Sequence, residues 1–214
     1  MMMPSAPGLS AAVLPGGDEE ASLRVVIFGD SITAGYGLDS DQAFPALMQT
    51  KAEEEGWADV EIVNAGLSGE TSAGGLRRID WILRRPIDIF VLELGGNDGL
   101  RGIDPEVTRE NLGGIIEKVR AADENTRILL TGMEAPPNMG ASYVEEFRSI
   151  YPRIAEEYDV ALMPFILEDV AGEPGLNQAD GIHPTAEGNE IIAENLWSYL
   201  RPIIAEALET HRTP

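Results

Sequence analysis

Short apolar runs alternate along the chain with longer segments in which apolar residues recur at helical spacing. Five apolar runs have the length and residue types of buried strands: 24–28, 60–63, 88–92, 127–131 and 160–163. The segments between and after them are amphipathic, and we expect helices over 42–55, 72–83, 105–121, 143–157 and 185–207. Alternating strands and helices form parallel sheets covered on both faces. The pattern therefore predicts an α/β protein, a three-layer α/β/α sandwich with a five-stranded parallel sheet.

Local signals refine two of these helices and the domain limits. Asp104 can cap a helix that starts at Pro105, while Pro152 should kink or break the helix around it. Residues 1–22 are rich in Gly, Pro, Ser and Ala, and we expect a flexible tail there, followed by one domain over 23–210. The tail lacks the basic start and apolar run of a secretory signal, so a cytoplasmic location is expected.

Charge and composition narrow the possible functions. The 214 residues carry a net charge of −22, which disfavours binding to nucleic acids or anionic lipids. No stretch is long and apolar enough for stable membrane insertion. The chain has no cysteine, which excludes disulfides, thiolate nucleophiles and cysteine-ligated zinc. The acidity fits either a very soluble enzyme or adaptation to high salt, which would screen the repulsion between like charges.

Polar clusters follow the predicted strands at their carboxyl ends, where ligands bind in open α/β sheets. Gly29-Asp30-Ser31 follows the first run, 68–70 the second and 96–98 the third, and 180–183 lies just before the last helix. All four clusters should converge on one rim of the sheet. The sequence therefore predicts a functional pocket at this rim.

Only two histidines are available as a general base. His211 lies in the polar C-terminal end, whereas His183 lies in a turn, three residues after Asp180. A carboxylate at this spacing can orient the imidazole, as a catalytic triad requires. The alternative is that Asp180 and His183 only form a turn and a helix cap. Their place at the predicted rim favours the catalytic interpretation.

Ser31 is the candidate nucleophile, because it directly follows a buried strand and precedes a Gly-rich helix start. Backbone N–H groups at such a start can stabilise an oxyanion. The Asn97 amide and the Gly69 backbone N–H are further candidate donors, although Asn and Gly are also common turn residues. Asp30 is adjacent to Ser31 and is expected to brace the loop rather than to join a triad.

These motifs together resemble the SGNH (GDSL) hydrolase superfamily. The segments 29–36, 93–102 and 180–184 are similar to its thioesterase I, lysophospholipase and arylesterase subgroup. The resemblance implies a flavodoxin-like SGNH hydrolase domain and a triad of Ser31, Asp180 and His183. It also implies an oxyanion hole made by Ser31, Gly69 and Asn97, and neither a metal nor an organic cofactor. Gly66 is a second glycine in the same block, but the family spacing favours Gly69.

The expected reaction is two-step acyl transfer to water from a small-molecule ester, thioester or lysophospholipid. Apolar residues after two strands suggest room for acyl chains or aryl rings, and residues 165–176 can add a wall. The expected substrate contacts are Leu100, Ile103, Met133 and Ala135. The alternative is that these side chains only pack their loops.

Two other functions fit parts of the sequence. A carbohydrate acetylesterase could use the same triad and would prefer small acetyl esters. A non-catalytic flavodoxin-like module could bind phosphate through residues 29–37, but this segment lacks the Lys-Ser/Thr ending of a P-loop. The sequence leaves the oligomeric state open, with a monomer plausible for such a sheet.

Overall fold

A single parallel sheet organises the computed structural model, which describes residues 23–211. Its strands are ordered β2-β1-β3-β4-β5. Their bounds are β1 Leu23–Gly29, β2 Val60–Gly66, β3 Ile89–Glu93, β4 Arg127–Thr131 and β5 Ala161–Met163. The predicted five-stranded parallel sheet is confirmed for the described residues. The predicted tail, residues 1–22, lies outside them, so its flexibility and the cytoplasmic location stay predictions.

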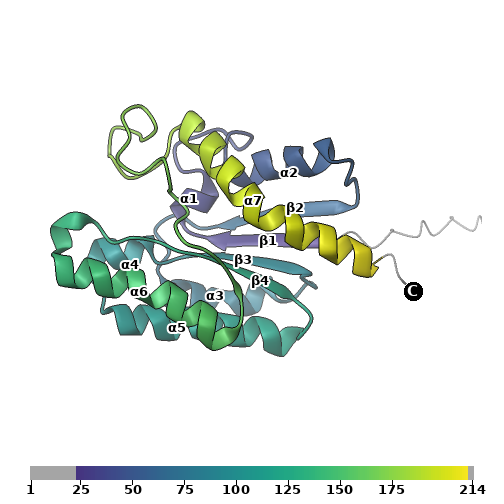
Figure 1. Ribbon diagram of the computed structural model, residues 1–214, viewed down its shortest axis with the longest axis horizontal. Coiled ribbons are helices and arrows are strands. Elements are labelled where there is room, and N and C mark those ends of the chain that lie inside the picture. The colour runs from purple at the N-terminus through teal and green to yellow at the C-terminus, as the bar shows by residue number, and fades with distance from the viewer. Residues whose placement is uncertain (1–22, 212–214) are drawn as a thin grey trace, which may run out of the picture.

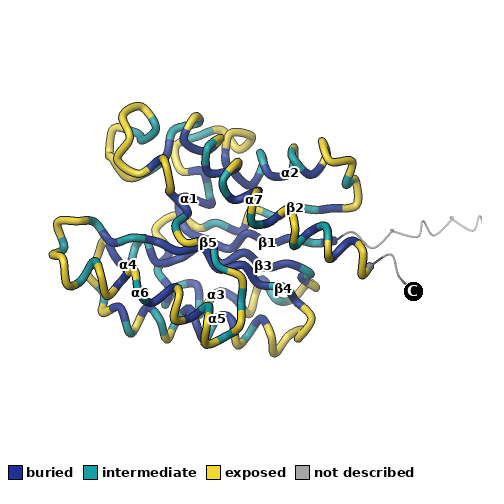
Figure 2. The backbone as a smooth tube through the Cα atoms, viewed as in Figure 1, coloured by how far each residue is buried: buried dark blue, intermediate teal, exposed yellow. Residues whose placement is uncertain are grey.

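Central strands are more buried than edge strands because both their faces and both their edges are covered. Every residue of β3 is buried, and in β1 all but Arg24 are buried. In β2, which pairs with β1 alone, most side chains are half-buried or exposed. Figure 2 shows the same gradient, with the middle of the sheet in dark blue. The continuous apolar runs therefore mark the strands on which the site is built.

Helices cover both faces of the sheet, with α2 and α7 on one side and α3, α5 and α6 on the other (Figure 1). Their bounds are α2 Phe44–Glu54, α3 Ser72–Ile82, α5 Pro105–Ala122, α6 Ala141–Tyr158 and α7 Ala186–His211. Asp104 caps α5 as predicted, since its side chain accepts a hydrogen bond from the Glu106 N–H. Within residues 23–211, no helix combines the length and hydropathy that crossing a bilayer requires.

Three short helices lie between the strands and the long helices: α1 (Ser31–Ala34), α4 (Gly96–Arg101) and the 3₁₀ turn η1 (Pro137–Met139). The sequence predicted the helix start at Ser31, but it predicted neither α4 nor η1. Each is too short to display helical periodicity in the sequence. Helix α6 runs unbroken through Pro152, so of the two expectations at this residue the break was wrong and the kink stays a prediction. Pro152 is exposed, whereas Phe147, Ile150 and Ile154 are buried and hold both halves of the helix against the core.

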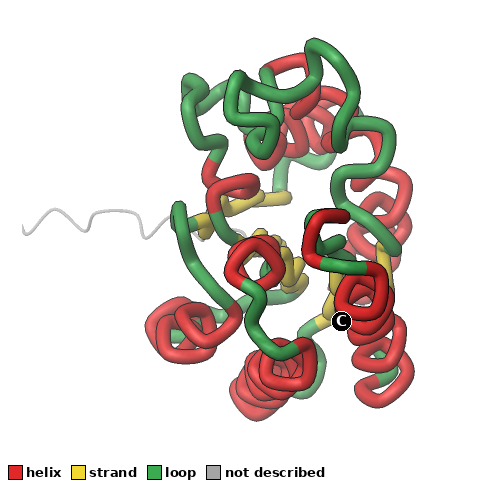
Figure 3. Tube along the Cα trace, turned by 90° about the vertical axis from the view of Figure 1, so that its left-hand side faces the viewer, coloured by secondary structure: helices red, strands yellow, loops and turns green. Residues whose placement is uncertain are grey.

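The strand order reverses next to β1, since β2 lies on one side of it and β3 on the other. Such a switch point leaves a crevice beyond the carboxyl ends of the two central strands. Figure 3 looks onto the carboxyl ends of the strands, where the connecting loops gather in front of the sheet. The loops after β1, β2, β3 and β4 and the loop before α7 contribute to the site described below.

Candidate active site

Ser31 stands at the first position of α1, immediately beyond the end of β1. The Asp30 side chain caps this helix, because its Oδ1 accepts a hydrogen bond from the Ile32 N–H at 3.0 Å. Gly35 closes the helix in the left-handed conformation, with φ of 70°. Ser31 is buried to 8% exposure and lines a cavity. The turn thus holds the Ser31 hydroxyl at the floor of this cavity.

The glycine of the Gly-Asp-Ser motif, Gly29, has no space around it for a side chain. A Cβ at this position would meet Thr33 Oγ1 at 2.1 Å and Glu93 Oε2 at 2.4 Å. The absence of a side chain admits the Glu93 carboxyl group directly against the turn, where Oε2 accepts a hydrogen bond from Thr33 Oγ1. A local sequence motif therefore depends on a residue at the end of another strand.

His183 reaches Ser31 from the loop before α7. Its Nε2 lies 2.9 Å from Ser31 Oγ, and its Nδ1 lies 2.6 Å from Asp180 Oδ2. With the proton on Nδ1, the ring donates to Asp180 and accepts from the serine hydroxyl, which is the arrangement of a serine hydrolase relay. An antiparallel bridge between Asn177 and Pro184 closes the base of this loop. The structure thus brings together the three predicted triad residues.

Asp180 is held as an anion by its own loop. Its Oδ1 also accepts hydrogen bonds from the backbone N–H groups of Ile182 (2.9 Å) and His183 (3.1 Å). The hydrogen bond from the His183 ring, followed by these two, lowers the pKa of Asp180 to about 2. Asp180 is therefore ionised near neutral pH and fixes the orientation of the imidazole.

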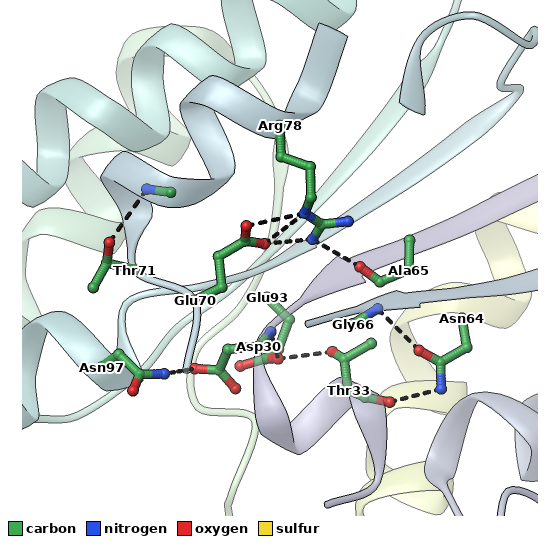
Figure 4. A network of polar contacts seen from close by, with 11 residues as sticks. Asp30, Thr33, Asn64, Ala65, Gly66, Glu70, Thr71, Arg78, Glu93 and Asn97 are labelled. Atoms are coloured by element: carbon green, nitrogen blue, oxygen red, sulfur yellow. Dashed lines mark hydrogen bonds and ion pairs between the residues drawn. The ribbon is translucent and has the colours of Figure 1, made fainter. Parts of the chain in front are cut away.

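The predicted oxyanion donors also face the cavity. Asn97, at the start of α4, donates one amide hydrogen to Asp30 Oδ2 at 3.1 Å, which leaves its second N–H available (Figure 4). Asp30 thus braces the site, as predicted. Gly69 lines the cavity with φ of 78°, a conformation that favours glycine. Gly66 is a poorer candidate, since its N–H already donates to Asn64 Oδ1 and its Cα packs against α1.

An ion pair between a buried carboxylate and a half-buried arginine supports the Gly69 segment (Figure 4). Glu70, the next residue, pairs with Arg78 of α3, whose Nε lies 3.0 and 2.9 Å from the two carboxylate oxygens. Arg78 Nη2 also donates to the Ala65 carbonyl at 2.9 Å, so it ties the segment to β2. On its other side, the Gly69 carbonyl accepts a hydrogen bond from Arg101 at 3.1 Å.

An apolar cavity of about 840 Å³ opens above Ser31 and His183. Leu100, Met133 and Ala135 line it, as the sequence suggested. Ile103 does not line the cavity, which corrects its predicted role as a substrate contact. Its backbone carbonyl instead accepts a hydrogen bond from Tyr143 at 2.6 Å, beyond the end of α4.

Several lining residues had no signal in the sequence. Tyr36 contacts the His183 ring, with ring centroids 4.5 Å apart, while Met139 comes from η1. Positions of this kind are recognisable only after the loops are folded together, because no periodicity marks a loop side chain that faces a pocket. Phe165 and Leu167 also line the cavity, and they belong to the wall that the sequence suggested over residues 165–176.

The charged groups at this cavity are acidic. Among the described residues that line it, the charged ones are Asp30 and Glu134, apart from His183, and there is no lysine or arginine. Glu134 pairs with Arg148 at 2.8 Å. Within residues 23–211 no cluster of three or more His, Asp or Glu side chains is arranged to hold a metal ion. The site therefore offers a nucleophile, a base and hydrogen-bond donors in apolar surroundings.

Comparison with known families decides the identity. The profile of the GDSL-like lipase/acylhydrolase family matches residues 27–191, most of the chain. The chain belongs to this family. The predicted SGNH (GDSL) membership and the predicted enzyme class, a carboxylic ester hydrolase, are thereby confirmed, and the non-catalytic module is set aside.

Several characterised relatives of this GDSL hydrolase belong to the subgroup that its motifs resemble. Esterase TesA of Pseudomonas aeruginosa is 43% identical over 188 residues, which cover 87% of this chain and 92% of the relative. Thioesterase 1/protease 1/lysophospholipase L1 of Escherichia coli K12 is 41% identical over 185 residues, 86% of each chain. The arylesterase of Vibrio mimicus is 38% identical over 82% of this chain and 86% of its own.

Solved structures agree with the fold. The crystal structure of TesA superposes with a TM-score of 0.80 at 43% identity and covers 84% of this chain and 99% of that one. The psychrotrophic esterase EstA from Pseudoalteromonas, inhibited by monoethylphosphonate, also gives a TM-score of 0.80, at 34% identity, covering 86% of this chain and 100% of its own. The flavodoxin-like SGNH hydrolase fold is therefore confirmed.

Proposed function

We propose that this GDSL hydrolase cleaves uncharged esters or thioesters that carry an apolar acyl or aryl group, with Ser31 as nucleophile. The observation that carries the proposal is the continuous relay from Asp180 through His183 to Ser31, at the floor of an apolar cavity. A relay of this geometry has one clear use in such surroundings, which is acyl transfer.

The first half of the reaction forms an acyl-enzyme. His183 Nε2 takes the Ser31 hydroxyl proton as Oγ attacks the carbonyl carbon, and the carbonyl electrons move onto the oxygen. The Asn97 amide, together with the N–H groups of Gly69 and Ser31, stabilises this oxyanion. The intermediate then collapses, and His183 gives its proton to the departing alcohol or thiol. Asp180 stays ionised throughout and stabilises the imidazolium.

Water completes the cycle. His183 removes a proton from water as its oxygen attacks the acyl-enzyme carbonyl, and the second tetrahedral intermediate expels Ser31 Oγ, which recovers the proton. Carboxylic acid is released.

The cavity itself supports the choice of substrate. Its apolar lining has room for more than an acetyl group, and its acidic groups, without a lining lysine or arginine among the described residues, disfavour an anionic substrate. The relatives named for esterase, thioesterase, lysophospholipase and arylesterase activity favour the same range. A carbohydrate acetylesterase with the same triad is the alternative, and strict preference for acetyl esters would favour it.

Hydrolysis of p-nitrophenyl esters from acetate to palmitate tests the proposal. We expect the wild-type protein to turn over a mid-range ester best and Ser31→Ala to lose at least about 10³-fold in kcat. An ethylphosphonate that carries a p-nitrophenolate leaving group, of the inhibitor class named for EstA, should react with Ser31 Oγ and release p-nitrophenolate. It should label the wild-type protein once and leave Ser31→Ala unlabelled, as measured by intact mass. Equal turnover by Ser31→Ala would refute the assignment of the nucleophile.

A further inference from the structure

Glu93 is a buried carboxyl group that the reaction above does not use. It is the last residue of β3 and has no solvent exposure. Its Oε2 accepts hydrogen bonds from Thr33 Oγ1 at 2.7 Å and from the Asp30 backbone N–H at 3.3 Å (Figure 4). Its Oε1 has no hydrogen-bond partner in residues 23–211. Glu93 thus contacts the Ser31 turn on both sides of the nucleophile.

A second buried carboxyl group, Asp30, lies beside it and is tied to the oxyanion hole. Asp30 is 1% exposed, and each of its oxygens accepts one hydrogen bond, Oδ1 from the Ile32 N–H and Oδ2 from the Asn97 amide. The direction of the Asn97 amide therefore depends on Asp30. Whether Asp30 is ionised depends in turn on whether the neighbouring Glu93 carboxyl group is ionised.

Burial and mutual repulsion prevent both groups from being charged near neutral pH. Burial, followed by the charge on Asp30, raises the pKa of Glu93 well above its ordinary range, and burial raises the pKa of Asp30 to about 6. The other ionisable groups that act on the pair are His183, Asp98 and the buried phenol of Tyr151. Asp30 has a donor for each oxygen and Glu93 has not, so the negative charge is better placed on Asp30.

We propose that Glu93 is a positioning residue that stays protonated, so that its neutral carboxyl group holds the Ser31 turn and leaves Asp30 ionised to orient Asn97. This inference rests on the proposed function of Ser31 and Asn97. A charged Glu93 would place a second negative charge in the same dry space and push the turn and the end of β3 apart. Glu93 would thereby act on the reaction through Asp30 and Asn97, without touching the substrate.

Two substitutions separate the neutral acid from a mere space-filler. Glu93→Gln keeps an oxygen for Thr33 and Asp30 and cannot ionise, so kcat should stay within about threefold of wild type at neutral pH. Glu93→Leu keeps the volume but removes both acceptors, and kcat should fall by about 10-fold to 10²-fold with little change in KM. A folded Glu93→Leu protein with wild-type kcat, or a Glu93→Gln protein as impaired as Glu93→Leu, would overturn the proposal.

Infrared spectroscopy of the intact protein tests the proton directly and needs no turnover. We expect the carbonyl stretch of a protonated carboxyl group in the wild-type spectrum at neutral pH and its absence in Glu93→Gln. Glu70→Gln is the matched control, because Glu70 is also buried but pairs with Arg78 and should contribute no such band. Identical wild-type and Glu93→Gln spectra in this region would exclude a protonated Glu93.

The two proposals can fail separately. If Ser31→Ala kept full activity, the assigned reaction would fail while the infrared band of Glu93 stayed informative about its proton. If Ser31→Ala were inactive and the band were absent, the hydrolase mechanism would stand and the role given to Glu93 would be wrong.

Discussion

At the scale of single residues, the site depends on a few groups whose freedom is removed by hydrogen bonds. Asp180 is fixed by two backbone N–H groups and the imidazole, and Asn97 is fixed by Asp30. Such preorganisation lowers the barrier because no reorientation is needed when charge develops on the substrate oxygen. Loss of one donor should therefore appear in kcat more than in KM.

Asn97→Ala tests this directly. Removing one oxyanion donor typically lowers kcat by about 10²-fold to 10³-fold, and we expect that loss here with KM nearly unchanged. Asn138→Ala is the control, since Asn138 lines the same cavity and has no assigned role in the reaction. Steady-state kinetics on one p-nitrophenyl ester suffices. A parallel loss in both variants would point to a general disturbance of the pocket.

The buried carboxyl groups of Asp30 and Glu93 lead to a second prediction, which concerns how the free energy of unfolding changes with pH. A carboxyl group whose pKa is raised by folding binds its proton more tightly in the folded protein, so its contribution to stability is lost as pH rises. The pKa of Asp30 is about 6 in the folded protein and about 4 in the unfolded chain, so its contribution to the free energy of unfolding is lost between these two pH values. The pKa of Glu93 is raised well above its ordinary range, so its contribution is lost at higher pH.

Urea unfolding of wild type and Glu93→Gln over about pH 5 to about pH 9 measures this effect. We expect the unfolding free energy of wild type to fall more steeply with pH than that of Glu93→Gln. Comparing the two proteins cancels the contribution of the many surface carboxylates that they share. Parallel curves would mean that Glu93 does not release a proton on unfolding.

At the scale of elements, the segments that carry the site are joined by a few long-range contacts. Asp98 of α4 accepts hydrogen bonds from the Ser72 N–H and hydroxyl, which fixes the start of α3 beside α4. Arg78, nearly two turns further along α3, holds Glu70 and the end of β2. The Gly69 segment is thus clamped from both ends, although it has no regular structure of its own.

Arg78→Met should therefore lower the free energy of unfolding. It leaves the buried Glu70 carboxylate without its cation, and breaking a buried pair in this way typically costs about 3–5 kcal/mol of unfolding free energy. Arg77→Met is the matched control, because Arg77 is exposed on the same helix and should be nearly neutral. Denaturant unfolding compares the two, and a similar small effect for both would show that water replaces the arginine at little cost.

At the scale of the whole molecule, charge is the unusual property. The chain has 37 acidic and 15 basic residues, and mutual repulsion at low ionic strength should strain the folded state. If the acidity is an adaptation to high salt, the melting temperature should rise between dilute buffer and molar salt. Repeating the scan with KCl and NaCl separates screening from a specific ion. A flat or falling melting temperature would argue against the adaptation.

The sequence by itself determined the layered fold, because strands and long helices each have a hydrophobic pattern that can be recognised from neighbouring residues alone. It also determined the candidate triad, since Ser31 and His183 each lie within a recognisable local motif. It predicted the helix start at Ser31 but could not predict α4, whose six residues are too few to show a helical period. It left Gly66 and Gly69 to be separated by family spacing alone.

Tertiary structure alone decided which of these residues meet. The partner of the Gly29–Ser31 turn is Glu93, whose carboxyl group arrives from a different strand, and nothing in either local motif encodes this contact. Folding likewise excluded Ile103 from the cavity and brought Tyr36 and Met139 into it. Such contacts depend on the relative placement of distant loops, which is fixed by packing of the whole sheet and its helices rather than by neighbouring residues.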